Sequence, residues 1–343
     1  MKKIIILLVI LTIVFFIGGW YVFGPASSDA NEKVFVIAKG EKVSEISQRL
    51  KEQNFIKNKF VFECYVWLNN LQSKFQPGEH KLRQNMNFWE IARILTKVSG
   101  PEERDIKIIE GWDNREIAEY LEKEGIVEKD VFLETIKNQE PVGNYGFLED
   151  RPEGATLEGY LFPDTYRIYK EIPKELLGDR DAGAALTEHI IGKMLDNFDK
   201  KLTADLREEI VRQKKTIFEI VTMASILEKE VKSDEDRAMV ADIFWRRLKA
   251  GMPLQADSTV NYATGKSAAR ASLNDLGIDS LYNTYKYKGL PKGPISNPGL
   301  GAIKAAIYPK SNNFWYFLTT DDGKVIYGRN FDEHKANKAK YLK

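Results

Sequence analysis

The stretch 216–231 (TIFEIVTMASILEKEV) contains three glutamates in a predicted amphipathic helix. At 100° per residue, Glu228 falls within the arc of the apolar side chains, whereas Glu219 and Glu230 fall on the opposite side. A carboxyl group held against apolar surface is harder to ionise, so we expect the pKa of Glu228 to be raised. Such a group can act as a general acid near neutral pH. The alternative is a structural role, in which a buried Glu228 pairs with a basic residue such as Arg237.

The chain around this helix predicts the elements that must hold it in place. Residues 184–213 have a polar helical pattern, and residues 251–300 are rich in Gly and Pro, which favours loops. Residues 314–318 and 325–327 flank an Asp-Asp-Gly turn and predict a β-hairpin, followed by a charged helix over about 332–343. We therefore predict a mixed α/β catalytic domain over residues 141–343.

An internal repeat precedes this domain. A shift of 71 residues aligns 33–63 with 104–134 without a gap, and each copy predicts a short strand, a Gly turn and an amphipathic helix. The pattern resembles LysM-like modules, which bind the N-acetylated sugars of cell-wall glycans. We assign residues 33–140 to such an α+β region, with a plain spacer as the alternative. The overall fold class predicted is α+β.

The N-terminus has the pattern of a membrane anchor. Residues 4–23 carry no charge and are long enough, as a helix, to cross the roughly 30 Å hydrocarbon layer. Lys2 and Lys3 precede the span and acidic residues follow it, which predicts a cytoplasmic tail of residues 1–3. Residues 24–32 are a predicted linker. We expect a single-pass protein of the cytoplasmic membrane with its C-terminal domain outside; a cleaved signal peptide is the alternative.

Composition disfavours several classes of function. The formal net charge is +1 without a long basic run, so nucleic-acid binding has little support. The three histidines, His80, His189 and His334, lack metal-ligand spacing, and we expect neither a metal nor a cofactor. Cys64 is the single cysteine, and we expect it to be buried as a small apolar side chain.

Several segments, in order along the chain, resemble the YceG-like family of endolytic murein transglycosylases. They are LEGYLFPDTY (157–166), VTMASILEKE (221–230), DRAMVADIFWRRLKAGMPLQADSTVNYATG (236–265), YNTYKYKGLPKGPISNPG (282–299) and AIKAAIYPK (302–310). The resemblance extends over essentially the whole chain. It implies that Glu228 is the catalytic residue, because the family's catalytic glutamate follows the matching ASI-hydrophobic sequence.

The implied reaction is lytic transglycosylation of peptidoglycan. Such an enzyme cuts the MurNAc–GlcNAc β-1,4 bond within glycan strands without water and leaves a 1,6-anhydro-MurNAc end. One carboxyl group suffices, because it protonates the leaving oxygen and then takes the proton of the sugar's own 6-hydroxyl. The resemblance also implies termination of nascent strands and cell-wall synthases as possible partners.

Polar residues in the matching segments are candidates for substrate contacts. Gln255 and Asp257 follow a tight Gly-Met-Pro turn, and Asn283 and Tyr285 lie in the Gly/Pro-rich stretch. Tyr160 offers a ring that could stack on a sugar. Further candidates are Asp164 and, more weakly, Glu158. For all of these residues, a role in holding the fold is the alternative.

Two other functions remain open. A muramidase that uses water would need a second carboxylate at a set separation, and Asp257 is the best candidate. A non-catalytic scaffold would bind glycan and position cell-wall synthases without cleaving it.

Overall fold

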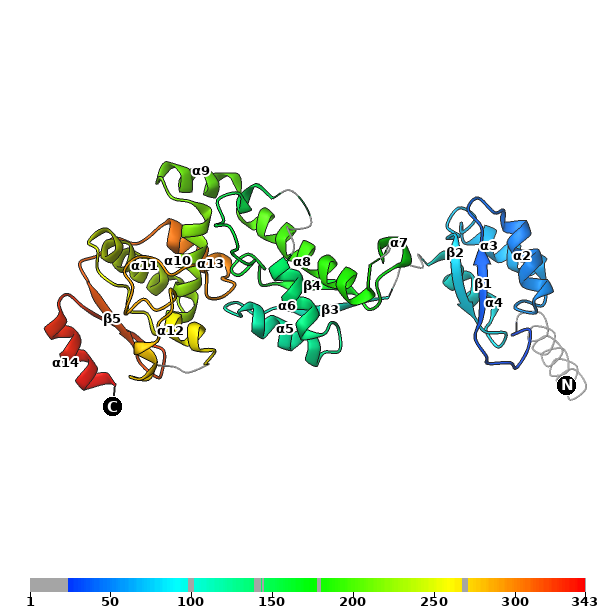
Figure 1. Cartoon of the computed structure of the whole chain (residues 1–343). Helices are drawn as coiled ribbons and strands as arrows, with labels where there is room; N and C mark the ends of the chain where they lie inside the picture. The colour runs from blue at the N-terminus through cyan, green and yellow to red at the C-terminus, as the bar shows by residue number, and fades with distance from the viewer. Residues whose placement is uncertain are drawn as a thin grey trace, which may run out of the picture. The chain divides into compact units, whose positions relative to one another are not determined.

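The computed structural model describes residues 24–97, 102–138, 143, 145–177, 180–266 and 271–342. The chain divides into two compact units, residues 1–100 and 101–343 (Figure 1). Within these described ranges, no helix has the length and apolar character needed to cross a membrane. The predicted span 4–23 lies outside the described residues.

The first unit packs three helices on a two-stranded sheet. Its elements are β1 (Lys33–Ile37), α2 (Val43–Glu52), α3 (Lys59–Leu68), β2 (Gly78–Leu82) and α4 (Phe88–Thr96). The strands are antiparallel, with Phe35 opposite His80. Alternation along β1 buries Phe35 and Ile37, which meet Ile46 and Leu50 of α2 in the core.

The expectation that Cys64 is buried is wrong, because its side chain is exposed on α3. This helix (KFVFECYVWL) is apolar on almost every face, but it buries only Phe62 and Val66. Cys64 lies two residues from each, about 200° around the helix, and therefore faces solvent.

The second unit begins with the other copy of the repeat. Its elements are β3 (Glu103–Lys107), α5 (Asn114–Lys123), α6 (Lys129–Asn138) and β4 (Thr165–Tyr169), and β3 pairs with β4 antiparallel. Each copy therefore has the order strand, helix, helix, strand. The turn glycines Gly40 and Gly111 have φ of 81° and 82°, which confirms the predicted strand, Gly turn and helix. Residues 102–138 belong to the second unit, so this compact unit begins before the predicted domain boundary at 140.

The remaining elements of the second unit are mostly helical. They are η1 (Gly146–Leu148), α7 (Lys174–Leu177), α8 (Ala182–Lys201), α9 (Ala204–Arg212), α10 (Ile217–Glu230), α11 (Asp234–Lys249), α12 (Asp257–Thr264), η2 (Asp275–Gly277), α13 (Leu300–Ile307), β5 (Tyr316–Thr319), β6 (Val325–Gly328) and α14 (Phe331–Tyr341). The predicted hairpin is β5–β6, and the predicted charged helix is α14. Every sheet of the described residues is a separate antiparallel pair, so the fold is a mixed α+β fold.

Helix α10 is the buried centre of this part of the chain. Its N-terminus is closed by a capping box: Glu219 N–H donates to Thr216 Oγ1 (3.1 Å), and Thr216 N–H donates to Glu219 Oε2 (2.9 Å). All residues from 220 to 227 are buried. Helices α11, α12 and α13 pack around α10, as Figure 1 shows, so its last turn is held from several sides.

Candidate active site

A groove of about 1410 Å³ runs across the second unit. It is lined by the loop before α5, the last turn of α10, the start of α12, the β5–β6 hairpin and α14. Glu228 lines this groove together with Gln255, Asp257 and Tyr285. Four of the predicted site residues are therefore brought to one surface.

Glu228 is held by two donors. Its side chain is 5% exposed and forms an ion pair with Arg237, whose Nη2 donates to Oε1. The other oxygen, Oε2, accepts the backbone N–H of Gly299 at 2.9 Å. Gly299 is the N-cap of α13, so the partial positive charge at the start of this helix is aimed at the carboxylate.

The pKa of Glu228 is raised above its ordinary value, and burial is the largest cause. The Gly299 N–H and Arg237 act in the opposite direction, and the nearby carboxylates of Glu110 and Asp234 raise it further. The direction agrees with the expectation from helical phase. The partner named for a structural role, Arg237, is also present, so the ion pair and the raised pKa belong to the same carboxyl group.

Glu230 also lines the groove, although the helical pattern placed it on the side away from Glu228. Its Oε1 accepts the backbone N–H (3.2 Å) and the hydroxyl (2.7 Å) of Ser258 on α12, and burial raises its pKa. The pattern assumes one buried face. Helix α10 is covered on several faces, so carboxylates on opposite sides of it both meet protein.

Gln255, Asp257 and Tyr285 form one wall of the groove. Tyr285 donates its hydroxyl to Asp257 Oδ1 at 2.6 Å. Gln255 has a φ of 54°, a left-handed conformation that is uncommon outside glycine, and its backbone N–H donates to Thr284 (3.1 Å). The exposed side chain of Gln255 therefore projects from a strained backbone conformation. Such conformations are frequent at functional sites.

The other predicted contacts lie outside the groove lining. Asn283 is fully buried, and its amide donates to the carbonyls of Leu276 and Ile278 (both 2.9 Å), so it holds a loop. Tyr160 is a core residue that packs between Phe147 and Phe198.

Asp164 also lies away from the groove. It accepts a hydrogen bond from the Asn197 amide (3.0 Å) in the turn before β4. Hydrogen bonding to Asn197 lowers its pKa. For Asn283, Tyr160 and Asp164, the fold-holding alternative describes the observed contacts.

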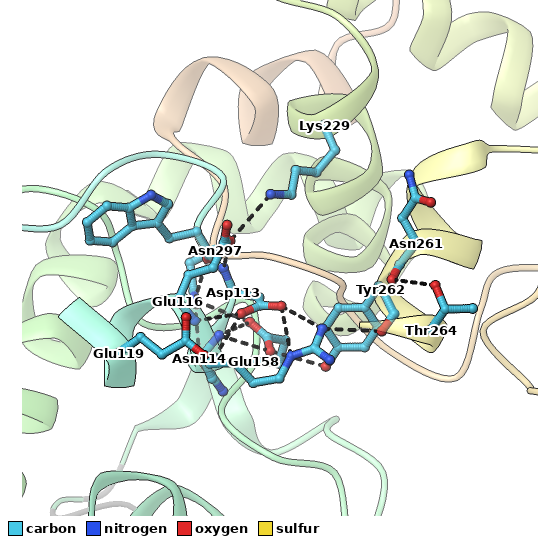
Figure 2. Close-up of polar contacts among 12 residues, drawn as sticks. Asp113, Asn114, Glu116, Glu119, Glu158, Lys229, Asn261, Tyr262, Thr264 and Asn297 are labelled. Atoms are coloured by element: carbon cyan, nitrogen blue, oxygen red, sulfur yellow. Dashed lines mark hydrogen bonds and ion pairs between the residues drawn. The ribbon is translucent and has the colours of Figure 1, made fainter. Parts of the chain in front are cut away.

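A buried polar network lies beside the groove (Figure 2). Glu158 is 4% exposed and accepts hydrogen bonds from the Asn114 backbone (3.1 Å), the Tyr262 hydroxyl (3.1 Å) and the Asn297 amide (3.3 Å). Burial raises the pKa of Glu158 to about 8, and the Asp113 carboxylate adds to this effect. Glu158 therefore joins three segments that are distant in the sequence.

Asn297 connects this network to Glu228. Its Oδ1 accepts the N–H groups of Gly159 and Leu161 (both 2.9 Å), and its backbone carbonyl accepts the N–H of Gly111 (2.9 Å). Gly111 lies against the Glu228 side chain, and Gly299 follows Asn297 by two residues. The network thus fixes both loops that lie against the side chain of Glu228.

Gly159 shows how closely these segments approach. It has a φ of 91°, and an added Cβ would lie 2.6 Å from Pro294 and 2.7 Å from Val221. Among the described residues, no group of three or more His, Cys, Asp or Glu side chains is arranged to hold a metal ion.

Comparison with known proteins identifies the family. The YceG-like family matches residues 35–340. The chain is 33% identical to the endolytic murein transglycosylase of Bacillus subtilis (strain 168) over 341 residues, which cover 95% of this chain and 91% of that protein. A protein of the same name from Streptococcus pneumoniae (strain ATCC BAA-255 / R6) is 32% identical over 92% of this chain, and the match spans 60% of that longer protein.

A solved structure of a YceG-like protein from Listeria monocytogenes agrees with this result. It has 32% sequence identity and a TM-score of 0.57, and the match covers 90% of this chain and 99% of that one. Because the family and its relatives match along almost the whole described chain, this protein belongs to the YceG-like family.

Proposed function

We propose that this protein is an endolytic transglycosylase that cleaves peptidoglycan glycan strands at the MurNAc–GlcNAc β-1,4 bond and leaves 1,6-anhydro-MurNAc ends. The observation that carries the proposal is the carboxyl group of Glu228: it lines a large groove, its pKa is raised by burial, and donors are in place for its ionised form. The family and the names of its relatives support this reaction.

The surroundings of Glu228 suit both steps of this reaction. Burial favours the protonated form, which gives its proton to the glycosidic oxygen as the bond from that oxygen to C1 breaks. The Gly299 N–H and Arg237 then stabilise the carboxylate that is left. The carboxylate takes the proton of the 6-hydroxyl while O6 bonds to C1. The proton is returned to Glu228, and no water is consumed.

A hydrolase is the second candidate because further carboxyl groups line the groove, among them Asp257 and Glu230. Asp257 accepts the Tyr285 hydroxyl and Glu230 accepts Ser258, just as Glu228 accepts Arg237 and Gly299, so the products must distinguish the two reactions. Mass spectrometry of the products from defined glycan strands separates the reactions, since hydrolysis adds the mass of one water. We expect anhydro ends; reducing ends would refute the proposal.

The location and the role of the first unit are part of the same proposal. The apolar span 4–23 and the charges beside it favour a single-pass anchor, with a cytoplasmic N-terminus and residues after about 30 outside the cell. The strand–helix–helix–strand order of the first unit is compatible with a LysM-like glycan-binding module. Termination of nascent strands beside membrane synthases would follow from such a location.

A further inference from the structure

Arg247 is a buried cation in the wall of the groove. It lies on α11, is 5% exposed and lines the groove near Leu254 and Tyr316. Its Nε donates to the carbonyl of Trp315 (2.9 Å) and its Nη1 to the carbonyl of Leu254 (2.8 Å). These bonds fix the plane of the guanidinium group.

No carboxylate of the described residues pairs with Arg247, since both of its acceptors are backbone carbonyls. No acceptor among the described residues is bonded to its Nη2, and Arg247 is part of the groove lining, so this nitrogen can serve a ligand in the groove. Burial of a charge without a counter-ion is unfavourable, and Arg stays protonated even where burial lowers its pKa, as it does here. The protein thus keeps a positive charge facing the space where substrate would lie.

Three carboxylates of the groove are engaged elsewhere. Glu228 forms an ion pair with Arg237. Glu230 accepts a hydrogen bond from Ser258, and Asp257 accepts one from the Tyr285 hydroxyl. The neighbouring Arg246, by contrast, has its own carboxylate, Asp242, at 2.9 Å. Arg247 therefore differs from the paired arginines beside it in having no internal anion.

The surroundings of Arg247 add aromatic and basic groups. Its guanidinium lies 4.9 Å from the ring centre of Tyr316, on which the His334 ring stacks at 5.2 Å. Lys338 lines the same part of the groove, and Lys335 is paired with Asp332 at 2.9 Å. This end of the groove is suited to a planar anion beside a ring.

We propose that Arg247 binds a carboxylate of the peptide stems carried by the glycan strand. The inference rests on the proposed function, in which the groove holds peptidoglycan. The sugar backbone between the stems is neutral, whereas the stems end in carboxylates. A guanidinium group can offer parallel N–H donors to such a group, which gives both affinity and orientation. Arg247 would make the enzyme select strands that still carry their peptides.

Binding by the full-length Glu228→Gln chain tests this inference without cleavage. Fluorescent glycan strands would be compared in two forms: with intact stems and with the stem carboxylates amidated. We expect the intact strands to bind about tenfold more tightly or better than the amidated strands, because the buried charge of Arg247 finds an anionic partner only on the intact strands. Equal binding of intact and amidated strands would overturn the proposal. This comparison is made with Arg247 unchanged.

Variants assign the effect to this side chain. Arg247→Gln should lose about tenfold or more in affinity for intact strands and less than about twofold for amidated strands. Arg247→Lys, which keeps the charge, should retain part of the preference. Arg246→Gln, which removes the paired neighbour outside the groove lining, should leave the preference unchanged. Equal losses on both kinds of strand would show that Arg247 only holds the carbonyls of Leu254 and Trp315, against the proposal.

The outcomes also separate this inference from the proposed function. The binding assay detects no product, so a preference for intact strands can appear even if the wild-type chain forms no anhydro ends, and only the proposed reaction would then fail. Anhydro ends without a preference for intact strands would refute the role of Arg247 alone.

Discussion

At the scale of single residues, Glu228 is subject to two opposing effects. Burial disfavours its charge, whereas the Gly299 N–H and Arg237 favour it, and the balance leaves the pKa raised. Helical phase placed Glu228 among the apolar residues of α10, but Glu230 on the other side is also buried, so phase alone does not separate the two. The pattern could not find Gly299, which lies 71 residues further along the chain, or the burial of Glu230 by α12.

The contact between the Gly299 N–H and Glu228 can be tested by substitution. Its φ of −75° suits proline, which lacks the N–H, so Gly299→Pro removes the hydrogen bond to Glu228. Since that bond lowers the pKa of Glu228, we expect its loss to raise the pKa. Activity needs protonated Glu228 first, so the fall in activity at alkaline pH should move to higher pH. We expect kcat to fall about tenfold, because the carboxylate formed in the reaction loses a donor.

Gly299→Ala is the matched control for this change. It adds the same Cβ, which would clash with Glu110 Oε1 and must displace that carboxyl group, but it keeps the N–H. The Glu110 carboxylate raises the pKa of Glu228, and both variants displace it, so we expect the alanine variant to lose activity at a lower pH than the proline variant. If the proline and alanine profiles coincide, the Gly299 N–H has no role in setting the pKa of Glu228.

At the scale of elements, local pattern predicted the α10 helix from its helical period and the hairpin from its Asp-Asp-Gly turn. The roles of Asn283 and Tyr160 depend on distant contacts that no local pattern reveals. The side-chain amide of Asn283 donates to two backbone carbonyls, and the ring of Tyr160 packs against Phe147 and Phe198. The aromatic and amide residues of the matching segments therefore include some that hold the fold around the site as well as some that line the groove.

Glu158 gives the buried network a pH dependence. Its pKa is about 8 in the folded protein against an ordinary value of 4.5. Between these values the folded protein holds a proton that the unfolded chain has lost, so stability falls as pH rises through this range. Glu158→Gln is neutral at every pH and lacks this dependence.

Melting temperatures at pH 5 and pH 8.5 test the point. The wild type should lose stability from pH 5 to pH 8.5. The Glu158→Gln protein should lack this loss, so its melting temperature relative to the wild type should be higher at pH 8.5 than at pH 5. We expect a relative change of at least a few degrees, as 1 kcal/mol corresponds to about 2–4 °C in a domain of this size. A constant difference between the two proteins across this range would show that Glu158 keeps an ordinary pKa.

At the scale of the whole molecule, the repeat and the compact units divide the chain differently. Both copies have the same order of elements, but the second copy closes its sheet with β4 and packs into the unit that holds the groove. The sequence reveals the repeat because matching residues recur at a fixed spacing of 71. It cannot place the boundary, because the pairing of β3 with β4 spans about sixty residues.

The exposed Cys64 provides a test of the proposed location. It is the single cysteine of the chain and lies in the first unit, after the predicted span. In intact cells we expect a membrane-impermeant maleimide to label it. A Lys3→Cys variant that also carries Cys64→Ser should be labelled only after the cells are permeabilised. Labelling of Cys64 that requires permeabilisation would contradict an extracytoplasmic ectodomain.

The central claim is that Glu228 is the acid and base of a lytic transglycosylase. The most direct measurement is the rate at which the full-length wild-type and Glu228→Gln chains release anhydro-MurNAc ends from purified glycan strands. Loss of a general acid typically costs about 10²- to 10⁴-fold, and we expect a loss of this size with the melting temperature and strand binding preserved. A folded Glu228→Gln chain that forms anhydro ends at the wild-type rate would contradict the account.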